Sequence, residues 1–214
     1  MNLFQWFQKL WLRPSNAGRL PTWQNSFSSS KSNSTSEPPT TPKAAASKPK
    51  SPSAASYPEQ KIRTPNVSAK PIKPEAVVLH HSGGSYAGGV SWIRNPKSRV
   101  SYHVLVAQDG RRTVFAEPTQ RTWHAGFSSW RGKRDLNSWA IGAAFEGDTN
   151  KRELGEAEMA SMAEYLVPLM KRYGLTLDDV TDHRTVSPER KDDLAAAELA
   201  RFKDYLGERI QSAE

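Results

Sequence analysis

Histidines between residues 80 and 183 are the side chains of this 214-residue chain best suited to chemistry. His80 ends the apolar run 76–79, and functional groups commonly lie where a buried strand ends. His183 follows a second short strand pattern and precedes a polar run that closes with Asp192 and Asp193. Two imidazoles and one carboxylate with an open fourth position form the usual catalytic zinc site. The spacing also fits ordinary polar histidines at strand ends, so both interpretations stay open.

These side chains need a scaffold, and the pattern beyond residue 75 predicts one α/β domain. Short apolar runs typical of buried strands are interspersed with stretches whose apolar residues recur at helical spacing. We expect strands at 76–80, 102–107 and 140–145, a hairpin turn at 108–110, and helices at 156–173 and about 196–210. The fold expected for residues 76–212 is therefore a single mixed central β-sheet flanked by helices.

The first 75 residues have a different composition and are expected to lie outside that domain. Residues 1–74 carry eleven Lys or Arg and two Glu, a net charge of +9, which leaves the remainder close to neutral. Ser, Pro and Lys are abundant in residues 14–75, and this composition predicts a disordered linker. Residues 1–13 predict an amphipathic helix, whose residues 2–12 dock on a membrane, in a partner's groove or on the chain's own domain.

Composition also excludes several classes of protein. The chain has no cysteine, which rules out disulfide scaffolds and cysteine-ligated zinc. No run of eighteen apolar residues is present that could span a membrane. We expect no signal peptide, because Gln5, Gln8 and Lys9 interrupt the N-terminal apolar stretch. We also expect no nucleic-acid partner, because the positive charge belongs to the leader; a nucleic-acid-binding protein is an alternative that rests on that leader alone.

Six short motifs occur in a fixed order between residues 77 and 193. Together they resemble the type 2 N-acetylmuramoyl-L-alanine amidase family, which includes phage lysozyme-like amidases, bacterial muropeptide-recycling amidases and animal peptidoglycan recognition proteins. The resemblance covers nearly all of residues 76–212. The motifs are Val77–Ser82, Val100–His103, Asp109-Gly110, Trp123–Gly126, Asn137–Gly142, and His183 with Pro188–Asp193.

The resemblance implies a site and a reaction. It implies zinc held by His80, His183 and Asp193, with a water molecule in the fourth position and Asp192 as the rival ligand. The reaction would be hydrolysis of the amide between N-acetylmuramic acid and L-alanine in peptidoglycan. Lys191 would stabilise the developing oxyanion; the alternative is a surface lysine in a basic turn.

The resemblance also assigns roles around the metal. Tyr102 would orient the water or donate to the intermediate, unless it is simply a core aromatic of its strand. Trp123 and His124 would line the substrate groove; a buried tryptophan with a packing histidine is the alternative. His81 points to the other face of its strand, so we expect it not to be a ligand. His103 is expected to be structural.

Two departures from the family pattern affect the expected mechanism. Recycling-type members carry a glutamate base in the strand after Ile-Gly, where this chain has Ala144, and Glu146 two residues on is an imperfect substitute. The family's Pro-Gly after the third ligand is replaced by Leu194-Ala195. The first departure favours the tyrosine-using, phage-like type.

These features lead to an expected setting. We expect a lytic hydrolase that acts on the cell wall, delivered as a phage lysin, virion component or exported effector, since no signal peptide is visible. The alternatives are a cytosolic muropeptide-recycling amidase and a non-catalytic peptidoglycan-binding module.

Overall fold

The computed structural model describes residues 56–213. The predicted helix at 1–13, with its docking segment 2–12, and most of the predicted linker lie outside the described residues. Within the described part, no helix is long and apolar enough to cross a membrane.

Six strands form one mixed sheet at the centre of the domain, in the order β1-β5-β4-β9-β3-β10. Strands β4 and β5 pair antiparallel, and the other neighbours run parallel. Two small antiparallel pairs, β2–β6 and β7–β8, lie outside this sheet. The strands are β1 Glu59–Lys61, β2 Val67–Pro71, β3 Ala76–His81, β4 Val104–Val106, β5 Arg112–Val114, β6 Gln120–Thr122, β7 Ser129–Trp130, β8 Lys133–Arg134, β9 Ala140–Phe145 and β10 Val180–Asp182.

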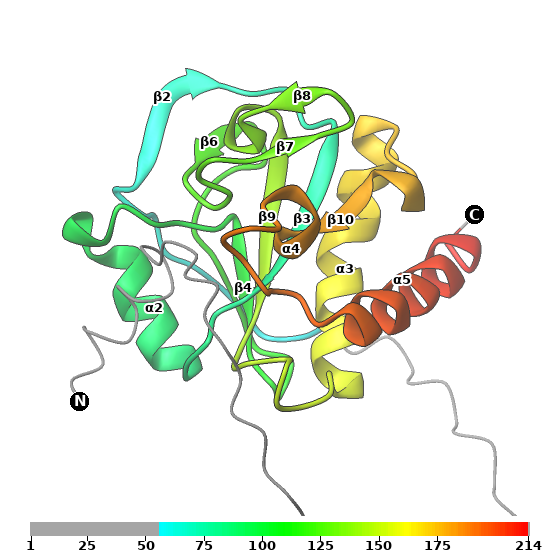
Figure 1. The fold of residues 1–214 in the computed structure, drawn as a ribbon. Coiled ribbons are helices and arrows are strands. Elements are labelled where there is room, and N and C mark those ends of the chain that lie inside the picture. The colour runs from blue at the N-terminus through cyan, green and yellow to red at the C-terminus, as the bar shows by residue number, and fades with distance from the viewer. Residues whose placement is uncertain (1–55, 214) are drawn as a thin grey trace, which may run out of the picture. The chain divides into compact units, whose positions relative to one another are not determined.

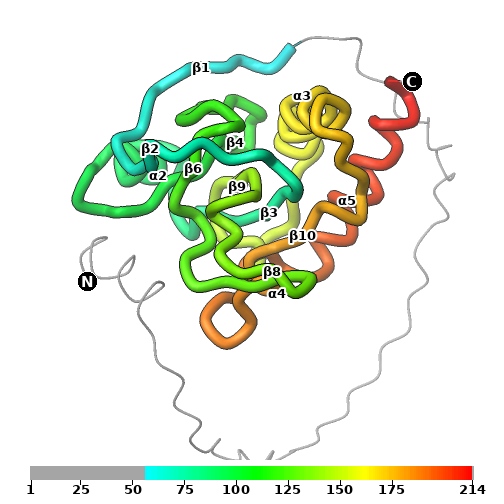
Figure 2. The backbone as a smooth tube through the Cα atoms, turned by 90° about the horizontal axis from the view of Figure 1, so that it is seen from above, coloured from blue at the N-terminus to red at the C-terminus, as the bar shows by residue number. Residues whose placement is uncertain are grey.

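Helices cover both faces of the sheet, which confirms the predicted fold class. Helices α3 and α5 lie side by side on one face, and α2 lies on the other (Figures 1 and 2). The helices are α2 Tyr86–Arg94, α3 Glu156–Tyr173, α4 His183–Val186 and α5 Ala196–Gln211, with 3-10 turns η1 Pro96–Ser98, η2 Leu136–Ser138 and η3 Leu177–Asp179.

Alternation along β3 decides which of its side chains meet which layer. Val77 and Leu79 belong to the core cluster beneath α3 and α5, whereas Val78 packs with residues of the opposite layer. Because successive strand side chains point to opposite faces, His80 emerges on the side away from α3 and α5. Its neighbour across the sheet is Ala144 on β9.

The predicted start of the domain at residue 76 is wrong. Residues 59–61 form β1, which pairs with β5 at the sheet edge, and residues 67–71 form β2, which pairs with β6. Ile72 is buried, and Asn66 is buried beneath residues 93–100, where its side-chain nitrogen donates to three backbone carbonyls. The Pro- and Lys-rich composition conceals these strands because each is stabilised by a distant partner rather than by its own apolar pattern.

Candidate metal centre and active site

Three donor atoms converge at one end of the central sheet. His80 Nδ1 lies 3.0 Å from His183 Nδ1 and 3.1 Å from Asp193 Oδ2, and His183 Nδ1 lies 3.2 Å from the same carboxylate oxygen. All three residues are buried. Strands β3 and β10 are parallel neighbours, so the histidines at their carboxyl ends meet, and the loop before α5 brings Asp193 to them.

The donor set fits a zinc ion. Ligand bonds of about 2.0–2.1 Å in a tetrahedron place the ligand atoms ~3.3 Å apart, close to the three distances above. The rival ligand Asp192 has an exposed side chain, and its backbone carbonyl accepts from Asn150 and Arg184. The geometry therefore favours Asp193.

Backbone carbonyls fix the tautomers of both histidines. The Ala140 carbonyl can only accept, so His124 Nε2 carries the proton that it receives (3.3 Å), and His124 Nδ1 is left as an acceptor. His80 Nε2 then donates to His124 Nδ1 (3.1 Å). On the other side, His183 Nε2 donates to the Ala125 carbonyl (3.2 Å). In the neutral rings, both Nδ1 atoms present lone pairs to the cluster.

The charge states of His80 and His124 agree with this assignment. Burial, with the nearby His183, lowers the pKa of His80 to about 4, and burial likewise lowers the pKa of His124 well below its usual value. Burial opposes ionisation of Asp193, yet His183 and His80 hold the pKa of that carboxyl well below its ordinary range. Two lone pairs and a carboxylate oxygen thus meet within hydrogen-bonding distance, an arrangement that a cation satisfies.

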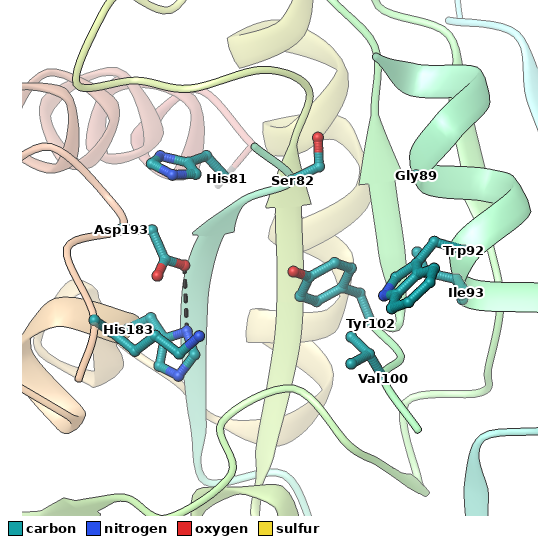
Figure 3. Close-up of a pocket in the computed structure, with 10 residues that line it drawn as sticks. His81, Ser82, Gly89, Trp92, Ile93, Val100, Tyr102, His183 and Asp193 are labelled. Carbon is teal, nitrogen blue, oxygen red and sulfur yellow. Dashed lines mark hydrogen bonds and ion pairs between the residues drawn. The ribbon is translucent and has the colours of Figure 1, made fainter. Parts of the chain in front are cut away.

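Tyr102 and Lys191 line the same pocket as His183 and Asp193, an open space of about 460 Å³ (Figure 3). The ring of Tyr102 lies 5.0 Å from the ring of His80. Burial raises the pKa of Tyr102, so the phenol keeps its proton. Burial lowers the pKa of Lys191 to about 8. Both side chains can therefore donate to an oxygen in the pocket at neutral pH.

The predicted substrate contact of His124 is wrong. The side chain is fully buried and lies behind His80, where it accepts from that ring. Trp123 is half-buried, and its indole N–H donates to Ser68 Oγ of β2. In the structure, His124 therefore lies behind the metal-binding donors, and Trp123 is hydrogen-bonded to the β2–β6 strand pair.

The remaining predicted positions have defined partners. Glu146 accepts from the backbone N–H groups of Tyr86 (2.8 Å) and Gln108 (3.0 Å), which is a structural role. His103 donates to the Gln120 carbonyl and accepts from the Gly142 N–H, also a structural role.

Sequence reasoning missed the wall of the pocket formed by α2, which contributes Gly89, Trp92 and Ile93. Two consecutive glycines, Gly88 and Gly89, disguise this helix as a loop. A Cβ at Gly89 would lie 2.8 Å from Leu105 Cδ2, so the glycine allows α2 to pack closely on β4. The adjacent glycines are the feature of the sequence that could have indicated a close packing contact here.

Comparisons with known proteins agree with this geometry. The sequence model described as N-acetylmuramoyl-L-alanine amidase matches residues 70–195, more than half of the chain. The chain is similar to the 1,6-anhydro-N-acetylmuramyl-L-alanine amidase AmpD of Haemophilus influenzae, with 38% identity over 96 residues that cover 44% of this chain and 52% of that protein. The chain thus spans about half the length of this curated relative.

Two solved structures share the fold. A crystal structure of an AmpD derivative superposes with a TM-score of 0.57 at 24% identity, covering 70% of this chain and 95% of that chain. The amidase AmiD from E. coli, solved with anhydro-N-acetylmuramic acid-L-Ala-D-gamma-Glu-L-Lys, superposes with a TM-score of 0.53 at 22% identity, covering 63% and 59%. With the match over residues 70–195, these findings show that the chain belongs to the N-acetylmuramoyl-L-alanine amidase family.

Proposed function

We propose that the chain is a zinc amidase that hydrolyses the amide between N-acetylmuramic acid and L-alanine in soluble muropeptides carrying 1,6-anhydro-N-acetylmuramic acid. The observation that carries the proposal is the convergence of His80, His183 and Asp193, of which His183 and Asp193 line a pocket together with Lys191 and Tyr102. The choice of substrate is supported by the name of the Haemophilus influenzae relative and by the muropeptide bound to E. coli AmiD.

The expectation that the chain acts on the cell wall is wrong. Relatives from several bacteria are named as amidases of 1,6-anhydro-N-acetylmuramyl-L-alanine, which is a muropeptide rather than the intact wall. That name corresponds to the recycling class, the alternative to a lytic enzyme that is expected from the sequence.

His80, His183 and Asp193 would hold the zinc ion. When bound, zinc supplies Lewis acidity that polarises a carbonyl and activates water near neutral pH. The protein's own contribution is to keep the His80 imidazole neutral through burial and to keep the Asp193 carboxylate ionised. The site then combines two neutral ligands and one anionic ligand, which leaves a net positive charge facing the substrate.

Lys191 and Tyr102 supply the hydrogen-bond donors. Both line the pocket, whereas His124 is fully buried, so Lys191 and Tyr102 are the side chains that can donate to the oxygen of the scissile amide as its negative charge develops. Lys191 Nζ bears a proton below pH of about 8 and can pass it to the leaving amine of L-alanine. Tyr102 Oη keeps its proton and can donate a hydrogen bond without transferring that proton.

Ala144 gives this chain a different pocket from the one expected of a recycling enzyme. Its methyl group lies beside His80 in the sheet, at the position where the recycling type carries a glutamate. We infer that Tyr102 and Lys191 perform the reaction without that carboxylate.

The test compares two substrates under one assay. Purified full-length chain is incubated with anhydromuramyl-tripeptide or with purified sacculi, and peptides with a free L-alanine N-terminus are quantified. We expect faster release from the soluble muropeptide, loss of release with a chelator, recovery with zinc, and no release by Asp193→Ala.

Each contrary result has a defined meaning. Binding of the muropeptide without peptide release would overturn the enzyme in favour of a binding module. Faster release from sacculi would overturn the proposed substrate and leave the amidase chemistry standing.

A further inference from the structure

One side-chain oxygen, Asn137 Oδ1, accepts hydrogen bonds from two consecutive backbone N–H groups. His124 N lies 2.9 Å from it and Ala125 N lies 2.7 Å from it. Asn137 is buried and belongs to the 3-10 turn η2. Two N–H donors at this distance require an acceptor, so the oxygen rather than the amide nitrogen faces residues 124 and 125.

The two residues held in this way stand directly behind the two histidine ligands. His124 Nδ1 accepts from His80 Nε2 (3.1 Å), and the Ala125 carbonyl accepts from His183 Nε2 (3.2 Å). A single atom of Asn137 therefore fixes the segment that sets the orientation of both rings.

We propose that Asn137 is a positioning residue for the metal centre, which holds His80 and His183 in their metal-binding tautomers through residues 124 and 125. This inference rests on the proposed zinc site. Partners of the second ring nitrogen fix the tautomer and direction of a ligating histidine, and their loss typically weakens metal binding about 10–100-fold.

Asn137 is itself held firmly enough for this role. Leu136 N donates to Ser128 Oγ (3.1 Å), and Asp135 N donates to the Ser128 carbonyl (2.9 Å), so the start of η2 is tied to the loop after residue 126. Arg121 binds both carboxylate oxygens of Asp135 and donates to Ser138 Oγ (2.9 Å). The turn is thereby fixed on both sides of Asn137.

A matched control exists elsewhere in the fold. Glu146 also accepts two backbone N–H groups with one side chain, those of Tyr86 and Gln108, but neither of these groups contacts a histidine ligand. Asn137→Ala and Glu146→Ala therefore remove comparable structural support, and only the first removes support from the ligands. Asn137→Asp keeps the accepting oxygen and serves as the conservative rescue.

The experiment measures zinc affinity directly. The full-length wild type and the three variants are stripped of metal, checked for folding by circular dichroism, and titrated with zinc against a chromophoric chelator at pH 7. We expect Asn137→Ala to bind zinc about 10–100-fold more weakly, with Asn137→Asp and Glu146→Ala close to the wild type. We also expect the visible spectrum of the cobalt-loaded Asn137→Ala protein to differ from that of the wild type.

The outcomes separate this inference from the proposed function. If the wild type binds no zinc, the zinc site falls and the inference with it. If the wild type binds zinc and Asn137→Ala binds it equally well, only the inference is overturned. Should Asn137→Ala fail to fold, the imidazole nitrogen NMR spectrum of the metal-free wild type decides: Nε2–H tautomers for both His80 and His183 support the inference, and an Nδ1–H tautomer for either overturns it.

Discussion

Gly142 of β9 lies against the ring of His124, so close that a Cβ at position 142 would stand 2.4 Å from His124 Cγ. The ring can support His80 only because this strand residue has no side chain. The Trp123–Gly126 and Asn137–Gly142 motifs therefore meet at the contact between His124 and Gly142.

Gly142→Ala is expected to destabilise the metal-free protein by about 1–3 kcal/mol, because the added methyl group must displace a fully buried ring. Urea unfolding in the presence of a chelator measures the change. In the His124→Ala background, the same methyl group should cost clearly less, since the ring that it meets is gone. Equal costs in both backgrounds would show that the crowding at residue 142 has another source.

Much of the fold could be predicted because its evidence is local. Met159, Met162, Leu166 and Met170 recur at helical spacing, and the structure confirms the helix predicted at 156–173 as α3. Gly174 ends this helix in the left-handed conformation (φ 68°). The continuous apolar run of β3 likewise predicts a buried strand.

The remainder could not be predicted because it depends on distant partners. Strand β1 is exposed along its length and exists by pairing with β5. The role of His124 is set by the positions of His80 and Ala140, which no spacing in the sequence reveals. The order of the motifs indicated which residues meet at the site, and the hydrogen bonds of the folded chain show which of them stand behind the others.

Lys191→Met is expected to lower kcat for the anhydromuramyl-tripeptide about 10²–10³-fold with little change in KM. The variant loses a charged donor that acts on the developing oxyanion rather than on the bound substrate. Initial rates over a range of substrate concentrations separate the two constants. Lys171→Met, an exposed lysine in the last turn of α3, is the matched control and should leave both constants unchanged. A raised KM with unchanged kcat would assign Lys191 to substrate binding instead.

Tyr102→Phe is expected to lower kcat about 10²-fold while zinc affinity stays at the wild-type value. The substitution removes only the hydroxyl, which is the proposed donor in the pocket, and it keeps the ring that packs near His80. Steady-state kinetics and a zinc competition titration on the same preparation give the two readouts. Full activity in Tyr102→Phe would return Tyr102 to the role of a core aromatic and leave Lys191 as the sole donor proposed for the oxyanion.

The last prediction concerns the pH dependence of stability and uses His103, which lies outside the metal cluster. Burial of the ring lowers the pKa of His103 to about 4. The neutral ring accepts from the Gly142 N–H while it donates to the Gln120 carbonyl. The unfolded chain takes up a proton at this residue below pH of about 6.5, whereas the folded chain does so only near pH 4. The stability that His103 contributes is therefore present above pH 6.5 and is lost as the pH falls towards 4, by roughly 3 kcal/mol in total.

His80 and His124 add slopes of the same sign, so the test is a difference between two proteins. Urea unfolding of the metal-free wild type and of His103→Gln is measured between pH 4 and pH 7.5. The variant is expected to be less stable than the wild type at pH 7.5 and to lose less unfolding free energy on acidification. The slopes of unfolding free energy against pH should differ by an amount that corresponds to at most one proton. Parallel curves for the two proteins would show that His103 is protonated in the folded chain as readily as in the unfolded one, against the hydrogen bonds that surround it.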